Sequence, residues 1–286
     1  MISEACDRLV AAGCAPAEIE WLEPGQAVDI GFDGDVGNAR TALNDLEESY
    51  DIAVQPSEHR RKMLLVSDMD STMITVECID ELADYAGIKP EIAAITERAM
   101  AGELDFVAAL KARVALLAGL DESVIEQCLA ERVRPMPGAE TLVRTMAGWG
   151  AHTVLVSGGF TSFAEPVADM LGLAEIHANI LETSGSKLTG ALAGDIVDAA
   201  TKRMVLENAV RKKNIAMVQA LAVGDGANDL PMIRAAVDGC GLGVGFHPRP
   251  QLAQVANFSV RHGDLTSLLF AQGVPRKQWT AISAAK

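Results

Sequence analysis

The sequence predicts an α/β protein with a three-layer, Rossmann-like core around a mainly parallel sheet, an inserted helical cap, and a small α+β unit in front. Three observations predict this class. After residue 135, short apolar runs alternate with helix-length segments, a pattern typical of parallel strands joined by crossover helices. Residues 78–133 contain helical patterns only, although they follow an apolar run at 63–66. Residues 56–62, PSEHRRK, are polar and include a proline, which is typical of a linker.

The first predicted unit covers residues 1–58. Its expected elements, in order, are a helix at 4–13, two strands at 19–32 around a Pro-Gly turn, a helix at 35–50 and a closing strand at 51–55. This unit resembles a shortened ACT domain, in which the usual βαββαβ order lacks its first strand. The resemblance leaves open a homodimer formed through this unit.

The core is predicted at 62–76 and 135–286, and the cap at 77–134. The expected cap helices are 77–87, 90–103, 105–119 and 121–133. The expected core elements after the cap are a helix at 137–150, a strand at 152–159, a helix at 161–173, a β-hairpin at 177–194, a helix at 200–214, a strand at 220–224 that runs into a loop, a strand at 241–246, a helix at 248–256 and a strand at 257–260.

The composition excludes several classes of protein. The formal charge is −15 and no basic run offsets it, so we expect no nucleic-acid partner. No stretch of 18 apolar residues is present, so we expect no membrane span. The five cysteines are odd in number and scattered, and the first residues lack the pattern of a signal peptide. We therefore expect a cytoplasmic protein without disulfides.

Polar motifs follow three of the predicted strands: SDMDST at 67–72, SGGFTS at 157–162 and GDGAND at 224–229. In an open parallel sheet the carboxyl ends of the strands share one edge, where ligands bind. Each motif has a plainer interpretation, because the first could be a helix N-cap and the last a plain or calcium-binding turn. Three such motifs in order on successive strands instead favour one functional site.

The order D-x-D-x-T, S-G-G, Lys and G-D-G-x-N-D resembles the haloacid-dehalogenase-like phosphohydrolases. Several longer runs are similar to the phosphoserine phosphatases within that superfamily; they are DMDSTMITVECIDELAD, ITERAMAGELDF, KARVALL, VSGGF, LTG and AVGDGAND. The resemblance covers about residues 64–245, and Met73 is its one unusual position. It implies hydrolysis of O-phosphoserine to serine and phosphate, the last step of serine biosynthesis, through an aspartyl-phosphate.

The resemblance also implies roles for the acidic residues. Asp68 would be the nucleophile, and Asp70 would protonate the leaving oxygen and later deprotonate water. Carboxylates next to a phosphate repel it, so a cation is required, and Mg²⁺ prefers oxygen ligands. Its implied ligands are the Asp68 side chain, the Asp70 backbone carbonyl and Asp225. Asn228 would contact the substrate, with Asp229 in support.

The phosphoryl group has its own implied contacts. Lys202 would bind its oxygens and Asp68, although composition alone would make it an exposed helix lysine. Ser157 and the amides of Gly158 and Gly159 would donate hydrogen bonds to the phosphate as charge develops.

Selectivity for the substrate is expected in the cap. By resemblance, Glu77 binds the ammonium group of phosphoserine and Arg113 its carboxylate, with Met100 and Phe106 as apolar contacts. From the residues alone, Glu77 could be a first-turn acid favoured by the helix dipole, and Arg113 a surface arginine with a buried stem.

Two other functions stay open. A related phosphotransferase would pass the phosphoryl group to an alcohol such as homoserine. An amino-acid-sensing regulatory protein would use residues 1–58 and carry an inert core, which the full set of Asp68, Asp70, Lys202 and Asp225 disfavours.

Overall fold

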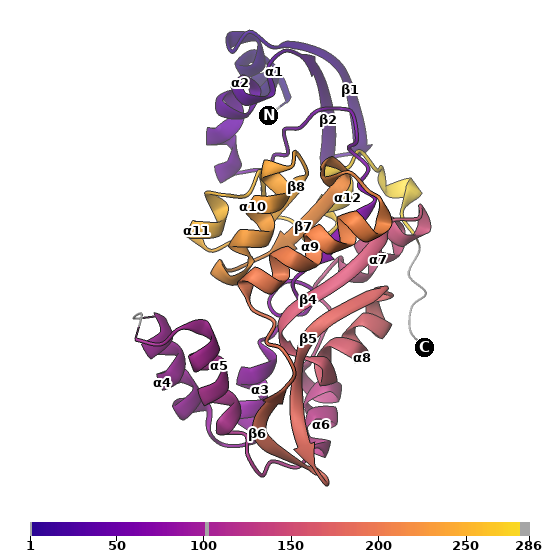
Figure 1. The fold of residues 1–286 in the computed structure, drawn as a ribbon. Helices are drawn as coiled ribbons and strands as arrows, with labels where there is room; N and C mark the ends of the chain where they lie inside the picture. The colour runs from indigo at the N-terminus through magenta and orange to yellow at the C-terminus, as the bar shows by residue number, and fades with distance from the viewer. Residues whose placement is uncertain (1, 101–102, 281–286) are drawn as a thin grey trace.

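The computed structural model describes residues 2–100 and 103–280, apart from the side chain of Met100. We call residues 2–58 the N-terminal unit, 77–134 the cap, and the remainder the core. The N-terminal unit and the cap lie at opposite ends of the molecule, with the core between them (Figure 1). The boundaries between these units stay a prediction.

The N-terminal unit packs two helices against a two-stranded antiparallel sheet. Its elements are α1 (Ile2–Ala11), β1 (Ala15–Glu23), β2 (Ala27–Asp33), α2 (Val36–Leu43) and the 3-10 helix η1 (Asn44–Glu48). Leu9 and Leu43 from the two helices are buried in a small core, against which Ile30 and Phe32 of β2 pack. The helices and the strand pair predicted for this unit are therefore confirmed.

The predicted closing strand at 51–55 is wrong, because these described residues pair with no strand. The Asp51 carboxylate instead accepts hydrogen bonds from the backbone N–H groups of Arg261, His262 and Gly263, at 2.6, 3.1 and 2.8 Å. The Gln55 amide donates to the Ala271 carbonyl at 2.6 Å. The segment leaves the small sheet because its polar side chains find partners on the core.

The core sheet confirms the predicted fold class. Within the described residues it has seven strands in the order β6-β5-β4-β3-β7-β8-β9, all parallel except β6. The strands are β3 (Leu64–Ser67), β4 (His152–Phe160), β5 (Glu175–Ser184), β6 (Lys187–Ala193), β7 (Ala220–Gly224), β8 (Leu242–Phe246) and β9 (Phe258–Val260). The chain turns to opposite sides of β3 to form β4 and β7, so the carboxyl end of β3 is the switch point where a ligand is expected.

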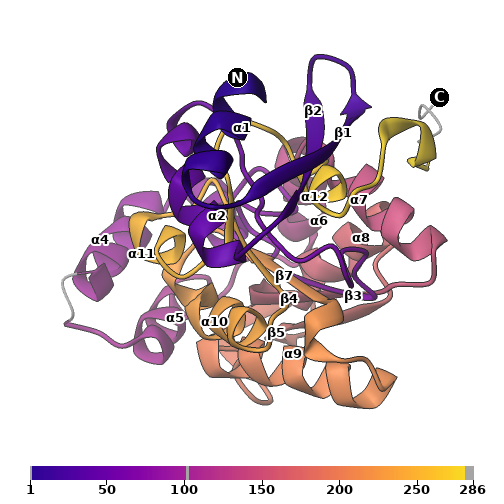
Figure 2. The same ribbon diagram turned by 90° about the horizontal axis from the view of Figure 1, so that it is seen from above.

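Helices cover both faces of this sheet (Figure 2). One side holds α7 (Ala139–Gly148), α8 (Thr161–Leu171) and α12 (Ser267–Ala271), and the other holds α9 (Ala199–Lys213), α10 (Leu230–Asp238) and α11 (Pro250–Ala253). Alternation along β3 makes this possible, since Leu65 packs on the first side and Leu64 and Val66 on the second. Short 3-10 helices are η2 (Met217–Gln219), η3 (Ala227–Asp229) and η4 (Arg276–Gln278). No helix in the described ranges is long and apolar enough to cross a membrane.

Two helices of the core, α10 and α12, were not identified from the sequence. No element is predicted between the motif at 224–229 and the strand at 241, but α10 begins at Leu230, with Pro231 in its first turn. A proline is well tolerated there because that N–H would have no partner inside the helix. Pro166 lies inside α8, which nevertheless runs unbroken from Thr161.

The cap contains the four predicted helices, α3 (Cys78–Tyr85), α4 (Lys89–Met100), α5 (Phe106–Ala115) and α6 (Ser123–Arg132). Its two connections to the core pair with each other, since the Met136 N–H donates to the Met73 carbonyl at 2.8 Å. The loop between α5 and α6 also bonds to the β5–β6 hairpin, where the Gly119 N–H donates to the Leu188 carbonyl at 2.8 Å. The cap is thus attached both at its linkers and at its far end.

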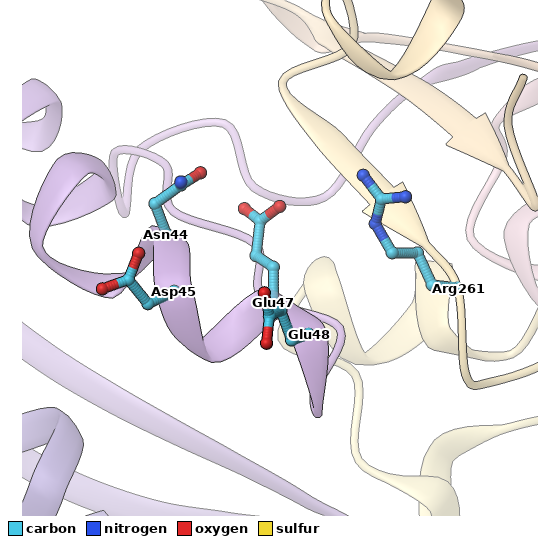
Figure 3. A pocket seen from close by; sticks show the side chains of 5 residues that line it. All are labelled: Asn44, Asp45, Glu47, Glu48 and Arg261. Carbon is cyan, nitrogen blue, oxygen red and sulfur yellow. The ribbon is translucent and has the colours of Figure 1, made fainter. Parts of the chain in front are cut away.

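A pocket of about 290 Å³ lies at the junction of the N-terminal unit and the core (Figure 3). Its lining residues are Asn44, Asp45, Glu47 and Glu48 of η1 and Arg261, which follows β9. Burial raises the pKa of Glu47, and Arg261 and Arg40 oppose that shift. The pocket lies where the two units meet, and none of its lining residues belongs to the motifs at 67–72, 157–162 or 224–229.

Candidate active site

Two neighbouring strands bring their terminal carboxylates together. Asp68 follows β3, and its N–H donates to the Val223 carbonyl of β7 at 3.0 Å, which extends the parallel ladder by one residue. Asp225 follows β7 directly. The ladder therefore places these two side chains side by side at the switch point, as the motifs predicted.

Lys202 lies between two of the carboxylates. It is in the first turn of α9, whose N-cap Asp198 accepts a hydrogen bond from the Thr201 N–H at 2.8 Å. Its ammonium nitrogen lies 2.6 Å from Asp68 Oδ1 and 2.7 Å from Asp229 Oδ1, and the side chain is only 1% exposed. Burial alone would lower the pKa of Lys202, but the carboxylates of Asp229 and Asp68 outweigh it and raise that pKa. The lysine stays charged.

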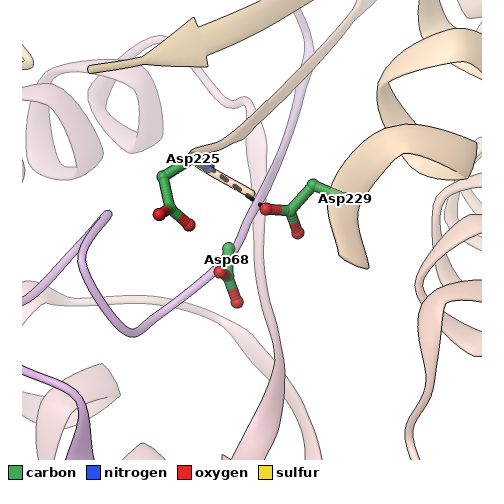
Figure 4. A group of neighbouring side chains, drawn as sticks. All are labelled: Asp68, Asp225 and Asp229. Atoms are coloured by element: carbon green, nitrogen blue, oxygen red, sulfur yellow. Dashed lines mark hydrogen bonds between the residues drawn. The ribbon is translucent and has the colours of Figure 1, made fainter. Parts of the chain in front are cut away.

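Asp229 holds the loop after β7 in place. Its Oδ2 accepts hydrogen bonds from the N–H groups of Asp225 and Gly226, at 3.1 and 3.2 Å (Figure 4). Gly224 is required here, because a Cβ at that position would lie 2.3 Å from the Asp229 carboxyl carbon. Both oxygens of Asp229 are thus occupied, which fits the supporting role predicted for it.

The carboxylates gathered here can hold a divalent metal ion. One oxygen of each of Asp68, Asp225 and Asp229 lies within 4.8 Å of the others (Figure 4). Because Asp229 is already bonded through both oxygens, Asp68 and Asp225 are the side chains that can serve as ligands. Counting Lys202, the group carries a formal charge of −3 + 1 = −2. Burial and then Asp229 raise the pKa of Asp68 well above its usual range, and the same causes raise the pKa of Asp225 to about 6. A divalent cation would relieve this repulsion, and an all-oxygen set suits Mg²⁺ or Ca²⁺.

Asp70 lies on the turn that follows Asp68. The Met69 carbonyl accepts hydrogen bonds from the N–H groups of Thr72, Met73 and Ile74, which reverses the chain. Asp70 Oδ1 accepts a hydrogen bond from the Cys78 N–H at 3.2 Å, at the start of α3. Burial, and then the nearby charge of Glu77, raise the pKa of Asp70 to about 7. A carboxyl group with this pKa can both give and take a proton near neutral pH.

The S-G-G segment forms a bulge at the end of β4. Pairing between β4 and β5 is interrupted between Val156 and Phe160, so residues 157–159 lie outside the ladder. Ser157 is buried, and its Oγ accepts a hydrogen bond from the Gly159 N–H at 2.8 Å. The amide that was expected to bind phosphate is therefore used within the segment.

The S-G-G segment also lies against Asp70. A Cβ on Gly159 would be 2.9 Å from Asp70 Oδ2, so only glycine allows this close approach. Ser157 Oγ would be 3.0 Å from the same point. The structure thus brings Asp70 and the serine hydroxyl to one place.

Phe106 reaches the site from the cap. It begins α5 and is 37% exposed, and its ring carbon Cζ would lie 3.3 Å from a Cβ on Gly158. Met100, the other expected apolar contact, has its side chain outside the described residues. Asn228 lies half-buried in η3, and a Cβ on Gly226 would be 2.7 Å from its Oδ1.

Glu77 and Arg113, the two cap residues expected to select the substrate, differ from each other in burial and in hydrogen bonding. Glu77 is exposed at the N-cap of α3, and its Oε1 accepts a hydrogen bond from the Ser71 hydroxyl at 2.7 Å. Arg113 is half-buried on α5 and donates only weakly to the Ala109 carbonyl of its own helix, at 3.4 Å. Burial lowers the pKa of Arg113, while the charges of Asp80 and Glu77 oppose that shift. No ion pair within the described residues includes Arg113, so its guanidinium remains available to bind an anionic group.

One buried polar residue near the site was not identified from the sequence. Asn179 of β5 donates a hydrogen bond to the Gly158 carbonyl at 2.8 Å. Asparagine is depleted in strands, so its presence in the run HANIL was the available signal.

Known proteins resemble this chain over most of its length. A sequence model of the haloacid dehalogenase-like hydrolase family matches residues 65–234. A phosphoserine phosphatase of Mycobacterium tuberculosis is 43% identical over 255 residues, and one of Albidiferax ferrireducens is 46% identical over 211 residues. These alignments cover 88% and 72% of this chain. The chain spans 61% of the length of the Mycobacterium relative and 87% of the Albidiferax relative.

A solved structure supports the same relationship. It is a phosphoserine phosphatase that carries an analogue of its phospho-aspartyl intermediate, and it superposes with a TM-score of 0.66 at 34% identity. The superposition covers 73% of this chain and 98% of that structure.

Proposed function

We propose that this chain, which belongs to the haloacid dehalogenase-like hydrolases, is a magnesium-dependent phosphoserine phosphatase. The observation that carries the proposal is the buried pair of Lys202 and Asp68 at 2.6 Å, beside an Asp70 whose pKa is about 7. A nucleophilic carboxylate, a cation that neutralises phosphoryl oxygens, and an acid–base group are the parts that hydrolysis through an aspartyl-phosphate needs. The names of the relatives support phosphoserine as the substrate.

The first chemical step forms the aspartyl-phosphate. An oxygen of Asp68 attacks phosphorus, and the bond between phosphorus and the serine oxygen breaks. Asp70, protonated at this point, gives its proton to the leaving oxygen, so serine departs as a neutral alcohol. Lys202 and the Ser157 segment would stabilise the charge on the other phosphoryl oxygens, which is supported by the contact of Lys202 with Asp68 and by the closeness of the segment to Asp70.

The second step regenerates the enzyme. Asp70, now a carboxylate, takes a proton from water, and the water oxygen attacks phosphorus. The bond to Asp68 breaks and phosphate leaves, so each group returns to its starting state. Bound Mg²⁺ would supply positive charge that offsets the charge of the phosphoryl oxygens, and the residues that would hold it are the side chains of Asp68 and Asp225 with the Asp70 backbone carbonyl.

Selection of phosphoserine is assigned to the cap. The half-buried Arg113 supplies a positive charge for the substrate carboxylate, and the exposed Glu77 supplies a negative charge for its ammonium group. Phe106 stands over Gly158, where it would close the site over the phosphoryl group. A cytoplasmic location and a dimer through the N-terminal unit stay predictions.

The test is phosphate release from a panel of phosphorylated amino acids and sugars, with Mg²⁺ and with chelator. We expect the highest kcat/KM for O-phosphoserine and loss of turnover with chelator. Adding homoserine should leave the yield of free phosphate unchanged, because a phosphotransferase would instead produce phosphohomoserine. Equal turnover of all esters would contradict the substrate, and turnover in chelator would contradict the metal requirement.

A further inference from the structure

We infer that Asn179 is a positioning residue for phosphoryl transfer, because its side chain joins the S-G-G segment to the start of the helix that carries Lys202. The inference rests on the proposed function, since it assigns phosphate binding to Ser157–Gly159 and Lys202. Asn179 lies on β5 and is only 1% exposed, so a substrate that enters from solvent would not contact its side chain. Its effect is therefore exerted through the backbone it holds.

The first bond compensates for the bulge in β4. Val156 pairs with His177 and Phe160 pairs with Asn179, so three residues of β4 stand opposite a single residue of β5. This mismatch takes the Gly158 carbonyl out of the ladder, and a buried carbonyl without a partner is costly. The Asn179 Nδ2 group donates to that carbonyl at 2.8 Å. The bulge can thus present residues 157–159 at the site without an unsatisfied backbone group.

The second bond reaches a different element. Asn179 Oδ1 accepts a hydrogen bond from the Val197 N–H at 2.8 Å. Val197 precedes Asp198, the N-cap of α9, and Lys202 follows within the first turn of that helix. One side chain therefore sets the distance between the S-G-G segment and the helix start that aims Lys202 at Asp68.

The chemistry of the site calls for an amide. Val197 N–H requires an acceptor and the Gly158 carbonyl requires a donor, and a primary amide offers both on one short side chain. Aspartate keeps the size and the acceptor but has no N–H, so it sets two acceptors against each other at Gly158. Alanine removes both bonds.

The chain offers a matched control in Asn257. Its Oδ1 accepts from the Gly243 N–H at 2.9 Å, and its Nδ2 donates to the Gly241 carbonyl at 2.9 Å. Asn257 thus also makes one bond to a backbone N–H and one to a backbone carbonyl. These bonds lie at the amino end of β8, whereas the site lies at the carboxyl ends of the strands. Substitutions at the two asparagines remove the same kind of bond, at a fully buried position for Asn179 and a half-buried one for Asn257.

The experiment compares Asn179→Ala and Asn179→Asp with Asn257→Ala and Asn257→Asp. Four quantities are measured: Tm, kcat and KM for O-phosphoserine and for p-nitrophenyl phosphate, and the inhibition constant of inorganic phosphate. A small displacement of groups that hold a reacting centre can cost up to about 100-fold in rate. We expect both Asn179 variants to lose roughly 10- to 100-fold in kcat on both esters. Inorganic phosphate should also bind more weakly.

The control defines what would overturn the inference. The Asn257 variants should also lose Tm but keep the wild-type kcat. If the Asn179 variants retain wild-type kcat, or if both sites lose rate in proportion to Tm, Asn179 has only a structural role. Should Asn179→Ala fail to fold, the isosteric Asn179→Asp decides alone. A wild-type protein that hydrolyses p-nitrophenyl phosphate but not phosphoserine would refute the proposed substrate, and the Asn179 comparison would still be made on the first ester.

Discussion

Lys202 carries its charge in a place almost closed to water, and its two carboxylate partners determine what each substitution there will do. Removing one partner from a buried ion pair usually costs about 3–5 kcal/mol, because the remaining charge is left without compensation. Lys202 contacts both Asp68 and Asp229, at 2.6 and 2.7 Å. Loss of one carboxylate therefore still leaves the ammonium paired. A substitution at Asp68 should thus lower activity much more than it lowers the stability of the fold.

Asp68→Asn should abolish phosphate release while leaving the protein folded. Asparagine keeps the shape of the side chain but lacks the negative charge needed to attack phosphorus, and Lys202 retains Asp229. The measurement is phosphate release at saturating phosphoserine, with circular dichroism and Tm as the check on folding. Lys202→Met is the contrasting variant, since it strands two buried carboxylates and should lower Tm as well. A folded Asp68→Asn protein with wild-type turnover would exclude the aspartyl-phosphate mechanism.

Arg113→Ala should reduce selectivity more than chemistry. A guanidinium paired with a desolvated carboxylate contributes a few kcal/mol, so kcat/KM for phosphoserine should fall by roughly two orders of magnitude. Hydrolysis of p-nitrophenyl phosphate, which lacks the amino-acid groups, should change far less. Lys111→Ala is the matched control, because Lys111 is an exposed cation on the same helix. Equal losses on the two esters would mean that Arg113 supports the phosphate or the fold.

At the scale of elements, charged side chains connect β4, β5 and α9 near the amino ends of the two strands, whereas the site lies at the carboxyl ends. Glu175 begins β5, and its two carboxylate oxygens lie 2.8 Å from His152 Nε2 of β4 and 3.1 Å from His177 Nε2. Lys212 of α9 lies 3.6 Å away. The hydrogen bond with His152 is the largest cause that lowers the pKa of Glu175 to about 2, while partial burial opposes it. These contacts join β4, β5 and α9 far from the catalytic carboxylates.

The pH dependence of this stabilisation follows from the direction of the shift. A carboxyl group whose pKa falls from 4.5 to about 2 on folding stabilises the native state above pH 4.5 and loses that effect as the pH falls toward 2. Glu175→Gln should therefore unfold at lower urea than wild type at pH 5–7, and the difference should shrink between about pH 4.5 and 2. Activity at pH 7 should not change. A difference that grows in acid would refute this assignment.

At the scale of the whole molecule, the N-terminal unit is fastened to the core by polar contacts of the segment at 51–60. Asp51 accepts three backbone hydrogen bonds from residues 261–263. Arg60 pairs with Asp29 of β2 at 2.5 Å and donates to the Ala271 carbonyl at 3.4 Å. The N-terminal unit lies at the end of the molecule away from the cap (Figure 1). The described residues of the unit therefore contribute to stability, and none of the residues proposed for the site is among them.

Deleting residues 1–58 should leave a protein that still hydrolyses phosphoserine, because each proposed catalytic group lies beyond residue 66. Its Tm should fall, since the amides of 261–263 lose their acceptor. Asp51→Ala in the full chain isolates that contribution, which should be about 1 kcal/mol, or roughly 2–4 °C in Tm, with kcat unchanged. The measurements are scanning calorimetry and steady-state kinetics. A folded deletion variant without activity would show that the N-terminal unit takes part in the site.

Most of the order of strands and helices in the core could be predicted from the sequence, because short apolar runs alternate with segments of helical periodicity. Val66 and Ser67 lead straight into Asp68, and Gly224 leads into Asp225, so parallel pairing of two apolar runs was enough to bring the carboxylates together. Resemblance to a family then supplied the place of Lys202, which no local pattern distinguishes from an exposed lysine. α10 was missed because it follows the loop motif at 224–229 directly and has a proline, Pro231, in its first turn.

The features that the sequence could not predict depend on partners far along the chain. The segment at 51–55 has the composition of a strand, yet its polar groups bond with residues about 210 positions away, at 261–263 and 271. Asn179 reads as one polar residue in a strand, and only the three-to-one mismatch between β4 and β5 turns it into the link between the S-G-G segment and α9. The sequence by itself determined which residues form the strands of the core sheet and which motifs end them, because local patterns and short spacings suffice for that. Tertiary structure alone decided which backbone groups were left without partners and which side chains satisfied them, because every such group buried by folding must be paired.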